Sequence, residues 1–322
     1  MTGTEQRTLA ICIATCRRPE GLRALLASLD RIAVDEALLK PVLYVVDNAP
    51  DAPAVASAED ARALSRWPLT YVMEPRRGIV MARNRALDLA LPTADLIAFV
   101  DDDETVSPDW PASLVDTLDR HGADAVQGPV APRYARPPPS WIQDLGIFRQ
   151  GPFEDGMPRN SAATNNVLVR ADAIRRYGLR FDPDFNTTGG EDEEMFGRLR
   201  LAGGRIVASA HGCIDDTVPA HRMTVAWASR RSFRKGNTLG RIARRGRKDR
   251  VLRILKGFGA MARGIVTPLL RPGRVSGLIG GWLEVCRGAG MIAAFLNLRV
   301  VEYGPGLLTL DRRGTPLAKV DS

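Results

Sequence analysis

The sequence predicts an α/β fold, a mainly parallel sheet flanked by helices, followed by a basic, amphipathic helical region. Two observations predict it. Short apolar runs rich in β-branched residues alternate with leucines and alanines at helical spacing along the first hundred residues. The charge then changes sign: residues 220–300 hold 18 Lys/Arg and 2 acids, while the rest of the chain holds 27 Lys/Arg and 35 acids. We therefore predict an α/β domain over residues 1–218 and a helical region over residues 219–322.

Four strands are predicted in the first part of the chain, at residues 8–15, 42–46, 69–73 and 96–100. Helices are predicted between them, at residues 22–29, 54–64 and 79–91. Because parallel strands need a long crossover connection, usually a helix, this alternation predicts a mainly parallel sheet covered on both faces.

Beyond the fourth strand the pattern is less regular. We predict a helix up to about His121, strands at residues 125–128 and 165–169, and a helix that begins near Glu191. Residues 129–139 hold five prolines and are predicted to lack regular structure. Residues 146–161, rich in Gly and Pro, are predicted to form a long loop over the edge of the sheet.

The densest group of charges follows the fourth predicted strand, Asp101-Asp102-Asp103-Glu104. In parallel α/β sheets ligands bind outside the carboxyl ends of the strands, so Thr15, Asp47, Glu74 and these acids should converge. Adjacent carboxylates repel one another, and a cation that prefers hard oxygen ligands, such as Mg²⁺, Mn²⁺ or Ca²⁺, would offset the repulsion. The alternative is a solvated acidic turn that precedes a helix.

A second acidic group is preceded by two glycines, Gly189-Gly190-Glu191-Asp192-Glu193-Glu194. Acids in the first turn of a helix stabilise it by a few tenths to ~1 kcal/mol, and this alone could explain them. The glycines, however, let the backbone approach a ligand closely, and four acids exceed what capping needs, which favours a functional role. Neither Gly-x-Gly-x-x-Gly nor Gly-x-x-x-x-Gly-Lys follows a predicted strand, which disfavours a dinucleotide-binding fold and a P-loop kinase.

Five motifs follow one another along residues 8–205: Ile13-Ala14-Thr15-Cys16-Arg17-Arg18-Pro19, Val45-Val46-Asp47-Asn48, Gly78 with Ala82-Arg83-Asn84, Val100-Asp101-Asp102-Asp103, and Gly190-Glu191-Asp192. In this order they resemble the motifs of GT-A-fold family 2 glycosyltransferases. Residues 219–236, with Arg222-Met223-Thr224 and Trp227, are further similar to bacterial transferases of the succinoglycan and exopolysaccharide type.

The resemblance implies a nucleotide-sugar donor and a divalent metal, Mn²⁺ or Mg²⁺, with Asp101 and Asp103 of an Asp-x-Asp motif at the metal and the ribose. Asp47 matches the carboxylate that contacts the nucleobase. The implied nucleotide-binding residues are Thr15, Arg17, Asp47, Arg83, Asp101 and Asp102. Asp192 matches the general base, with Glu191 beside it.

The function implied is that of a metal-dependent, inverting hexosyltransferase, since a single displacement at the anomeric carbon inverts it. The donor is expected to be a UDP-sugar. The acceptor is expected to be a glycan, linked to polyprenyl diphosphate, in surface polysaccharide biosynthesis. The alternative that stays open is a non-catalytic protein that binds a nucleotide-sugar, or a polyanion such as nucleic acid, on the same scaffold. A sugar nucleotidyltransferase would need a Gly-rich phosphate loop near the first strand, and residues 15–19 contain none.

The basic C-terminal region alternates apolar runs with single cations. Its longest uncharged stretch, residues 288–298, has 11 residues, short of the ~20 that a membrane-spanning helix needs. We therefore predict no spanning helix and expect amphipathic helices that bind an anionic membrane surface or cap the α/β domain. Few aromatic residues lie between the arginines, so nucleic acid is not an expected partner.

The four cysteines form no Cys-x-x-Cys pair and lie in apolar runs, which predicts buried, reduced thiols. The first residues lack a signal-peptide pattern. We expect a cytoplasmic protein, peripheral on the inner face of the cytoplasmic membrane. His121 is expected to be a surface cation at a helix C-terminus. His211 and His221 lie in no fixed metal-binding motif, so structural roles are favoured for them and metal ligation by either stays the alternative.

Overall fold

The structure is a computed structural model that describes residues 6–49, 51–56, 58–245, 250–270, 275–298 and 300. The chain divides into two compact units. Unit 1 comprises residues 1–135, 148–186 and 191–218, and unit 2 comprises residues 136–147, 187–190 and 219–322. Two short segments from within the predicted first domain therefore belong to unit 2. Residues 301–322 of the predicted helical region lie outside the described residues.

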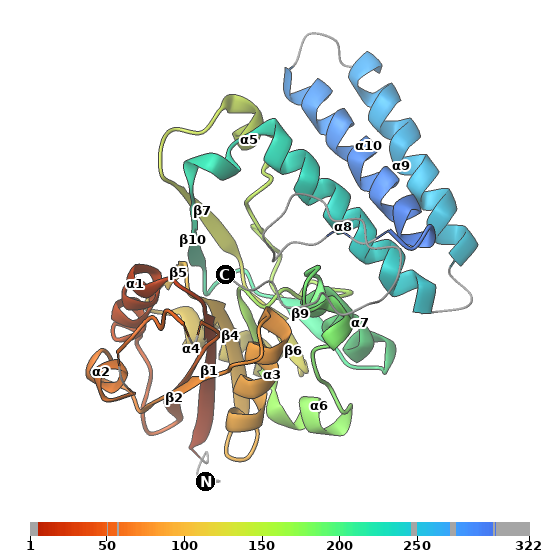
Figure 1. Cartoon of the computed structure of the whole chain (residues 1–322). Coiled ribbons are helices and arrows are strands. Elements are labelled where there is room, and N and C mark those ends of the chain that lie inside the picture. Colours follow the sequence, from red (N-terminus) through yellow and green to blue (C-terminus); the bar gives the residue numbers. More distant parts are fainter. Residues whose placement is uncertain are drawn as a thin grey trace. The chain divides into compact units, whose positions relative to one another are not determined.

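Unit 1 is built on a sheet of seven strands in the order β3-β2-β1-β4-β8-β6-β9 (Figure 1). The strands are β1 (Arg7–Thr15), β2 (Leu39–Asp47), β3 (Leu69–Met73), β4 (Leu96–Asp101), β6 (Ala125–Gln127), β8 (Val167–Arg170) and β9 (Ile206–Ala208). Strand β8 runs antiparallel to its neighbours β4 and β6, and the other neighbouring pairs are parallel. The predicted mainly parallel α/β sheet is confirmed.

The register brings three strand ends to one level. Thr15 at the end of β1 pairs with Asp47 at the end of β2, and Ala14 pairs with Asp101 at the end of β4. Since neighbouring strands lie about 5 Å apart, the predicted site residues of these strands gather at one edge of the sheet.

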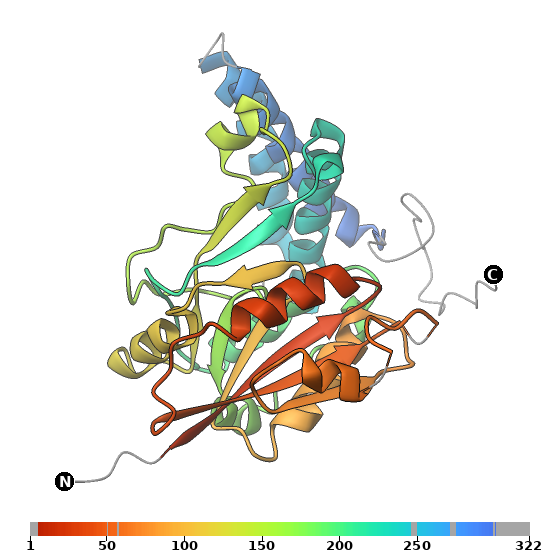
Figure 2. The same cartoon turned by 90° about the vertical axis from the view of Figure 1, so that its left-hand side faces the viewer.

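Helices cover both faces of this sheet. The side chains of Leu9, Ile11 and Ile13 in β1 pack in the core that includes α1 (Pro19–Leu29), α2 (Ala58–Ala63) and α4 (Trp110–Arg120). Ala10 and Cys12 point to the other face, which is covered by α3 (Ile79–Ala90), α6 (Ala171–Arg176) and α7 (Glu191–Leu201). Figure 2 shows α1 lying across the strands. The α2 helix is shorter than the predicted 54–64.

A second sheet of three strands adjoins the first within unit 1, in the order β5-β10-β7. Its strands are β5 (Glu104–Val106), β7 (Val130–Tyr134) and β10 (Ile214–Val218). The prediction that residues 129–139 lack regular structure is wrong for β7. This strand lies at the edge of its sheet, where Pro132 can lack an N–H without breaking a ladder on both sides.

The predicted long loop lies between β7 and β8 and is held against α4. Thr117 Oγ1 donates to Asp155 Oδ1 at 3.0 Å, and His121 Nε2 lies 3.0 Å from Asp155 Oδ2. His121 caps the C-terminus of α4. It lies at the C-terminus of the helix, as predicted, and its half-buried side chain is a partner of the loop, which was not predicted. Short 3-10 turns occur at Pro183–Phe185 in unit 1 and Ala220–Arg222 in unit 2.

Unit 2 contains α5 (Ser140–Leu145), α8 (Val225–Arg245), α9 (Arg250–Leu270) and α10 (Val275–Phe295). Helix α10 packs against both α8 and α9, and the long helices lie side by side in Figure 1. Glycines permit this approach: a Cβ at Gly281 of α10 would collide with the carbonyl oxygen of Gly264 in α9, and one at Gly236 of α8 with that of Arg287 in α10.

Helix α10 is long and apolar enough to cross a membrane by length and composition, with a mean hydropathy of 1.3 over its best 18-residue window. That no helix spans a membrane stays a prediction, but the sequence analysis missed a helix of this length and composition. It counted uncharged runs and stopped at Glu284 and Arg287. These two side chains form an ion pair at 2.7 Å on a continuous helix, and 39% of the window is buried inside the protein.

The four cysteines are free thiols. Cys12 is buried, and Cys213 and Cys286 are half-buried. Cys16, in the loop between β1 and α1, is exposed, so the prediction that all four are buried is wrong there. The loop follows the end of a strand, where the chain leaves the core.

Candidate active site

The first acidic group forms the turn between β4 and β5. Glu104 is buried, and its Oε2 accepts a hydrogen bond from the backbone N–H of Asp101 at 2.8 Å. Burial raises the pKa of Glu104 well above its ordinary value. Glu104 therefore fixes the shape of the turn and is not exposed to a ligand.

The middle carboxylate of the turn is directed into the protein. Thr15 Oγ1 donates to Asp102 Oδ2 at 2.8 Å, and burial raises the pKa of Asp102 to about 6. Arg18, at the N-cap of α1, contacts both Asp102 at 2.9 Å and Asp103 at 2.7 Å. The sequence motif contained Arg18, but nothing in its spacing distinguished it from Arg17 as the partner of these acids.

The first and third acids of the turn are the more accessible ones. The side chains of Asp101 and Asp103 are 36% and 25% exposed, against 7% for Asp102. Exposure therefore alternates along the three aspartates, because successive side chains point to opposite sides. The two exposed carboxylates are the first and third residues of the Asp-x-Asp motif.

Arg83 connects the two acidic groups. It lies on α3, and its Nη2 donates to Asp101 Oδ1 at 2.8 Å, while its Nη1 contacts Glu191 Oε1 at the start of α7. The Arg83 and Glu191 side chains are only 8% and 4% exposed. The sequence implied that Arg83 lines a nucleotide pocket and that Glu191 neighbours the base. In the structure one guanidinium joins both acidic groups.

Glu191 and Asp192 differ sharply in their surroundings, although they are adjacent in the first turn of α7. Glu191 is buried, and its Oε2 has no hydrogen-bond partner among the residues that the structure describes. Burial raises the pKa of Glu191 to about 7, against the opposing effect of Arg83. Asp192 is half-buried, and its Oδ1 accepts the N–H of Glu193 at 2.7 Å. Asp192 is therefore the more accessible carboxylate of the pair.

The raised pKa of Glu191 predicts a pH-dependent stability. A carboxyl whose pKa is higher in the folded state stabilises the fold when protonated, so this contribution is lost as pH rises from about 4.5 towards 7. We expect Glu191→Gln to remove the loss, so that between pH 5 and pH 8 the variant gains unfolding free energy relative to wild type. Urea unfolding of both proteins at the two pH values measures this, and parallel pH curves would contradict it.

Asp47 is buried at the end of β2 with its oxygens already bonded. It accepts hydrogen bonds from the backbone N–H of Ala49 at 2.9 Å, that of Ala54 at 2.6 Å and the Tyr71 hydroxyl at 2.6 Å. The implied contact of Asp47 with a nucleobase stays a prediction. In the structure its carboxylate already holds the backbone of Ala49 and Ala54 beside the end of β2.

Two asparagines that the sequence analysis did not assign hold the loop before α3. Asn48 Nδ2 donates to the carbonyl oxygens of Glu74 at 2.7 Å and Arg76 at 2.8 Å, and its Oδ1 accepts the N–H of Gly78 at 2.6 Å. Asn186 Oδ1 accepts the N–H of Val80 at 3.1 Å. Asn48 was visible as the polar residue after Asp47, whereas nothing in the sequence linked residue 186 to this loop.

Arg17 stands apart from the acidic turn. Its side chain is exposed and contacts Asp51, which follows β2. The backbone φ of Arg17 is 57°. Of the predicted nucleotide-binding residues, Thr15 contacts Asp102 and Arg83 contacts Asp101 at the acidic turn, whereas Asp47 at the end of β2 and Arg17 in the loop after β1 have other partners.

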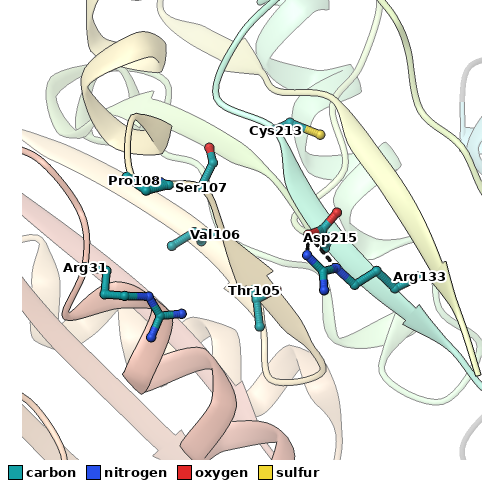
Figure 3. Close-up of a pocket in the computed structure, with 8 residues that line it drawn as sticks. All are labelled: Arg31, Thr105, Val106, Ser107, Pro108, Arg133, Cys213 and Asp215. Atoms are coloured by element: carbon teal, nitrogen blue, oxygen red, sulfur yellow. Dashed lines mark hydrogen bonds and ion pairs between the residues drawn. The ribbon is translucent and has the colours of Figure 1, made fainter.

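A cavity of about 420 Å³ opens beside the second sheet, separate from these residues (Figure 3). It is lined by Arg31, Thr105, Val106, Ser107, Pro108, Arg133, Cys213 and Asp215. Arg133 is already paired with Asp215, at 2.6 Å. None of the predicted site residues lines it, so it is not the predicted donor site.

The acidic turn can be tested for its fit to a metal. No three or more His, Cys, Asp and Glu side chains converge as a metal cage within the described ranges. Mg²⁺ is commonly held by one or two carboxylates together with the phosphates of the substrate, so a full protein cage is not required. Asp101 and Asp103, oxygen ligands that are partly exposed, fit a divalent cation that binds with a diphosphate.

Comparisons with known proteins agree with this arrangement. The family model described as glycosyl transferase family 2 matches residues 10–178. The chain is 37% identical over 243 residues to the succinoglycan biosynthesis protein ExoM of Rhizobium meliloti, an alignment that covers 73% of this chain and 75% of that protein.

Two solved structures share the fold. The mannosyltransferase PcManGT of Pyrobaculum calidifontis, in complex with GDP-Man and Mn²⁺, has a TM-score of 0.61 at 16% identity and covers 91% of this chain and 87% of that one. TarS 1-349 of S. aureus, in complex with UDP-GlcNAc, has a TM-score of 0.53 at 13% identity, with coverages of 96% and 98%. At these identities the likeness concerns the fold.

Proposed function

The chain belongs to glycosyl transferase family 2, and on this premise we propose that it transfers a sugar from a nucleoside-diphosphate-sugar to a hydroxyl group of a glycan acceptor, with inversion at the anomeric carbon. Its relative in succinoglycan biosynthesis supports a place in the assembly of an exopolysaccharide. The observation that carries the proposal is Arg83, whose guanidinium contacts both Asp101 and Glu191. The reaction needs one carboxylate group for the donor and one for the acceptor, close together.

On the donor side, we propose that Asp101 and Asp103 bind the ribose and a divalent cation, Mn²⁺ or Mg²⁺. When bound, the cation supplies Lewis-acid stabilisation of the negative charge that develops on the diphosphate as it leaves. Thr15, Arg18 and Glu104 hold the turn that presents these two carboxylates. Two structural neighbours bind UDP-GlcNAc and GDP-Man, respectively. We propose a UDP-sugar as donor.

On the acceptor side, we propose that Asp192 removes the proton from the attacking hydroxyl. Proton transfer to a positioned carboxylate contributes typically 10²- to 10⁴-fold to a rate. Glu191 supports this role indirectly: it anchors the first turn of α7 to Arg83 and leaves Asp192 as the accessible acid. The hydroxyl attacks the face of the sugar opposite the diphosphate, so one displacement inverts the anomeric carbon.

For the acceptor, we propose a glycan linked to polyprenyl diphosphate at the inner surface of the cytoplasmic membrane. The support is the charge of residues 220–300, which hold 18 Lys/Arg and 2 acids. Such a segment is attracted to anionic lipid headgroups, where a lipid-linked acceptor also lies.

The function is tested by incubating the purified protein with Mn²⁺ and a panel of UDP- and GDP-sugars, then measuring binding and slow hydrolysis of each. We expect one nucleotide-sugar to bind and to be hydrolysed. Binding without turnover, with or without added acceptor glycans, would instead support a non-catalytic nucleotide-sugar-binding protein.

Replacement of Asp103 tests the metal site. We expect Asp103→Ala to weaken donor binding in the presence of Mn²⁺ by more than about tenfold, because one of two carboxylate ligands is lost. Calorimetric titration with the nucleotide, with and without Mn²⁺, measures this. Asp109→Ala, an exposed carboxylate just beyond β5, is the matched control and should bind as wild type does. Equal affinity of Asp103→Ala and wild type would refute the assignment.

A further inference from the structure

Helix α9 has one face packed and one face open. Its packed face carries Gly257 and Gly264: a Cβ at Gly264 would collide with the carbonyl oxygen of Gly281 in α10, and a Cβ at Gly288 of α10 with that of Gly257. Ala260 is also buried on this face. The side chains on the opposite face of α9 are exposed, as far as the structure describes them.

The open face is apolar along the helix. Leu255, Phe258 and Ile265 are 60%, 56% and 60% exposed. At 100° per residue they share one side of α9 with three further exposed residues. We call this set the α9 strip: Val251, Leu252, Leu255, Phe258, Ile265 and Val266. Scattered surface leucines need no explanation, but an exposed row of large side chains along about four turns of one helix indicates a partner.

Helix α9 contains two exposed cations and no acids. No Asp or Glu lies on it, and Lys256 and Arg263 are exposed beside the strip. Arg263 contacts Glu284 of α10 at 3.5 Å, but its side chain stays 64% exposed. An apolar strip with cations along one edge complements a surface that is apolar within and anionic outside, which describes a bilayer rich in anionic lipids.

We propose that α9 lies flat in the headgroup region of an anionic membrane, with the α9 strip inserted among the acyl chains and Lys256 and Arg263 at the phosphates. The inference rests on the proposed function for its purpose, since it brings the enzyme to a lipid-linked acceptor. It does not depend on the chemistry of the site in unit 1. A helix in this position is inserted by about 5–10 Å, without crossing the bilayer.

Two other occupants fit less well. A second copy of this chain would bring the cations beside one α9 strip against those of the other, without acids on α9 to offset them. Helix α10 satisfies the length of a spanning helix, and Val275, Leu278 and Trp282 on it are exposed, but it packs against both α8 and α9 and carries the Glu284–Arg287 ion pair. Insertion of α10 would require separating three packed helices.

The test is flotation of the full-length protein with vesicles of phosphatidylcholine alone or with phosphatidylglycerol added at about a third of the lipid. We expect wild type to float with the anionic vesicles only. The double variant Leu255→Glu/Phe258→Glu should lose this binding by about tenfold or more, since it places two anions in the centre of the strip. Leu38→Glu changes an exposed leucine of unit 1 in the same way and should float as wild type does.

The outcomes separate the hypotheses. Because Leu255 and Phe258 are exposed, the double variant should keep the circular dichroism and the donor binding of wild type. Equal flotation of the double variant and wild type would overturn the proposal. So would a wild-type dimer that does not float and that the variant converts to a monomer. Resistance of membrane-bound wild type to carbonate extraction would point instead to a spanning α10. Failure of donor binding in wild type would count against the proposed function alone.

Discussion

Asp192→Asn is expected to reduce sugar transfer by about 10²- to 10⁴-fold, the range that a general base contributes. The amide has nearly the same shape as the carboxylate and still accepts the hydrogen bond from the N–H of Glu193 at its oxygen. The first turn of α7 therefore stays intact, and affinity for the nucleotide-sugar should stay within about twofold of wild type, because the acids at the donor are untouched. Transfer rates and donor titrations, measured on the same preparation, show the two effects separately.

A neighbouring acid provides the control for this variant. Glu193→Gln removes the same charge from the same helical turn and should retain most of the transfer activity. Near-wild-type turnover of Asp192→Asn would exclude it as the base. A loss of the same size in both variants would indicate that the charge of the turn matters, and not the proton transfer at Asp192.

Arg83→Met is expected to impair both stability and transfer. Without the guanidinium the pKa of Glu191 rises above about 7, so the buried carboxyl takes up a proton at neutral pH, and the loss should stay below the about 3–5 kcal/mol of a buried ion pair broken from one side. The variant also removes the guanidinium that links Asp101 to Glu191, so we expect the KM for the donor to rise and kcat to fall together. Arg83→Lys keeps the charge, but a single ammonium cannot reproduce two donors of a planar fork, and it should show the same pattern in weaker form.

The double variant Arg83→Met/Glu191→Gln separates stability from positioning. With both charges gone, no buried anion is left unpaired, and much of the lost unfolding free energy should return. Transfer should remain low because the double variant, like Arg83→Met, lacks the guanidinium that links Asp101 to the first turn of α7. Recovery of activity together with stability would mean that Arg83 serves folding only. Chemical unfolding and steady-state kinetics on the two single variants and the double variant complete this cycle.

The sequence predicted the sheet and the acids because both depend on local patterns. Apolar runs of strand length mark β1 to β4, and the register then places their polar ends together. The motif order predicted the family, which the family model and the 37% identical relative confirm. The details of the network escaped prediction because they depend on long-range contacts: Arg83 and Glu191 are 108 positions apart.

The misses share one physical origin, the influence of neighbouring elements on a weak local signal. Strand β7 was not predicted because it contains Pro132, and β10 was not predicted because three of its five residues are polar. The two strands pair with each other in the structure. The internal partners of Asp47 were not predicted, because they are backbone N–H groups of Ala49 and Ala54 and the hydroxyl of Tyr71, 24 positions away. Helix α10 was divided at two charges that the fold pairs with each other.

The position of α10 between α8 and α9 limits how the C-terminal region can be studied by deletion. The glycines of α10 face backbone on both sides, at Gly281 towards α9 and at Gly290 towards α8. Shortening the chain to remove α9 or α10 would uncover helix surface that has no side chains to shield its peptide groups from water. Aggregation or membrane binding of a truncated protein would then result from the newly exposed helix surface and would not be a property of the intact protein. Single substitutions on exposed positions avoid that ambiguity.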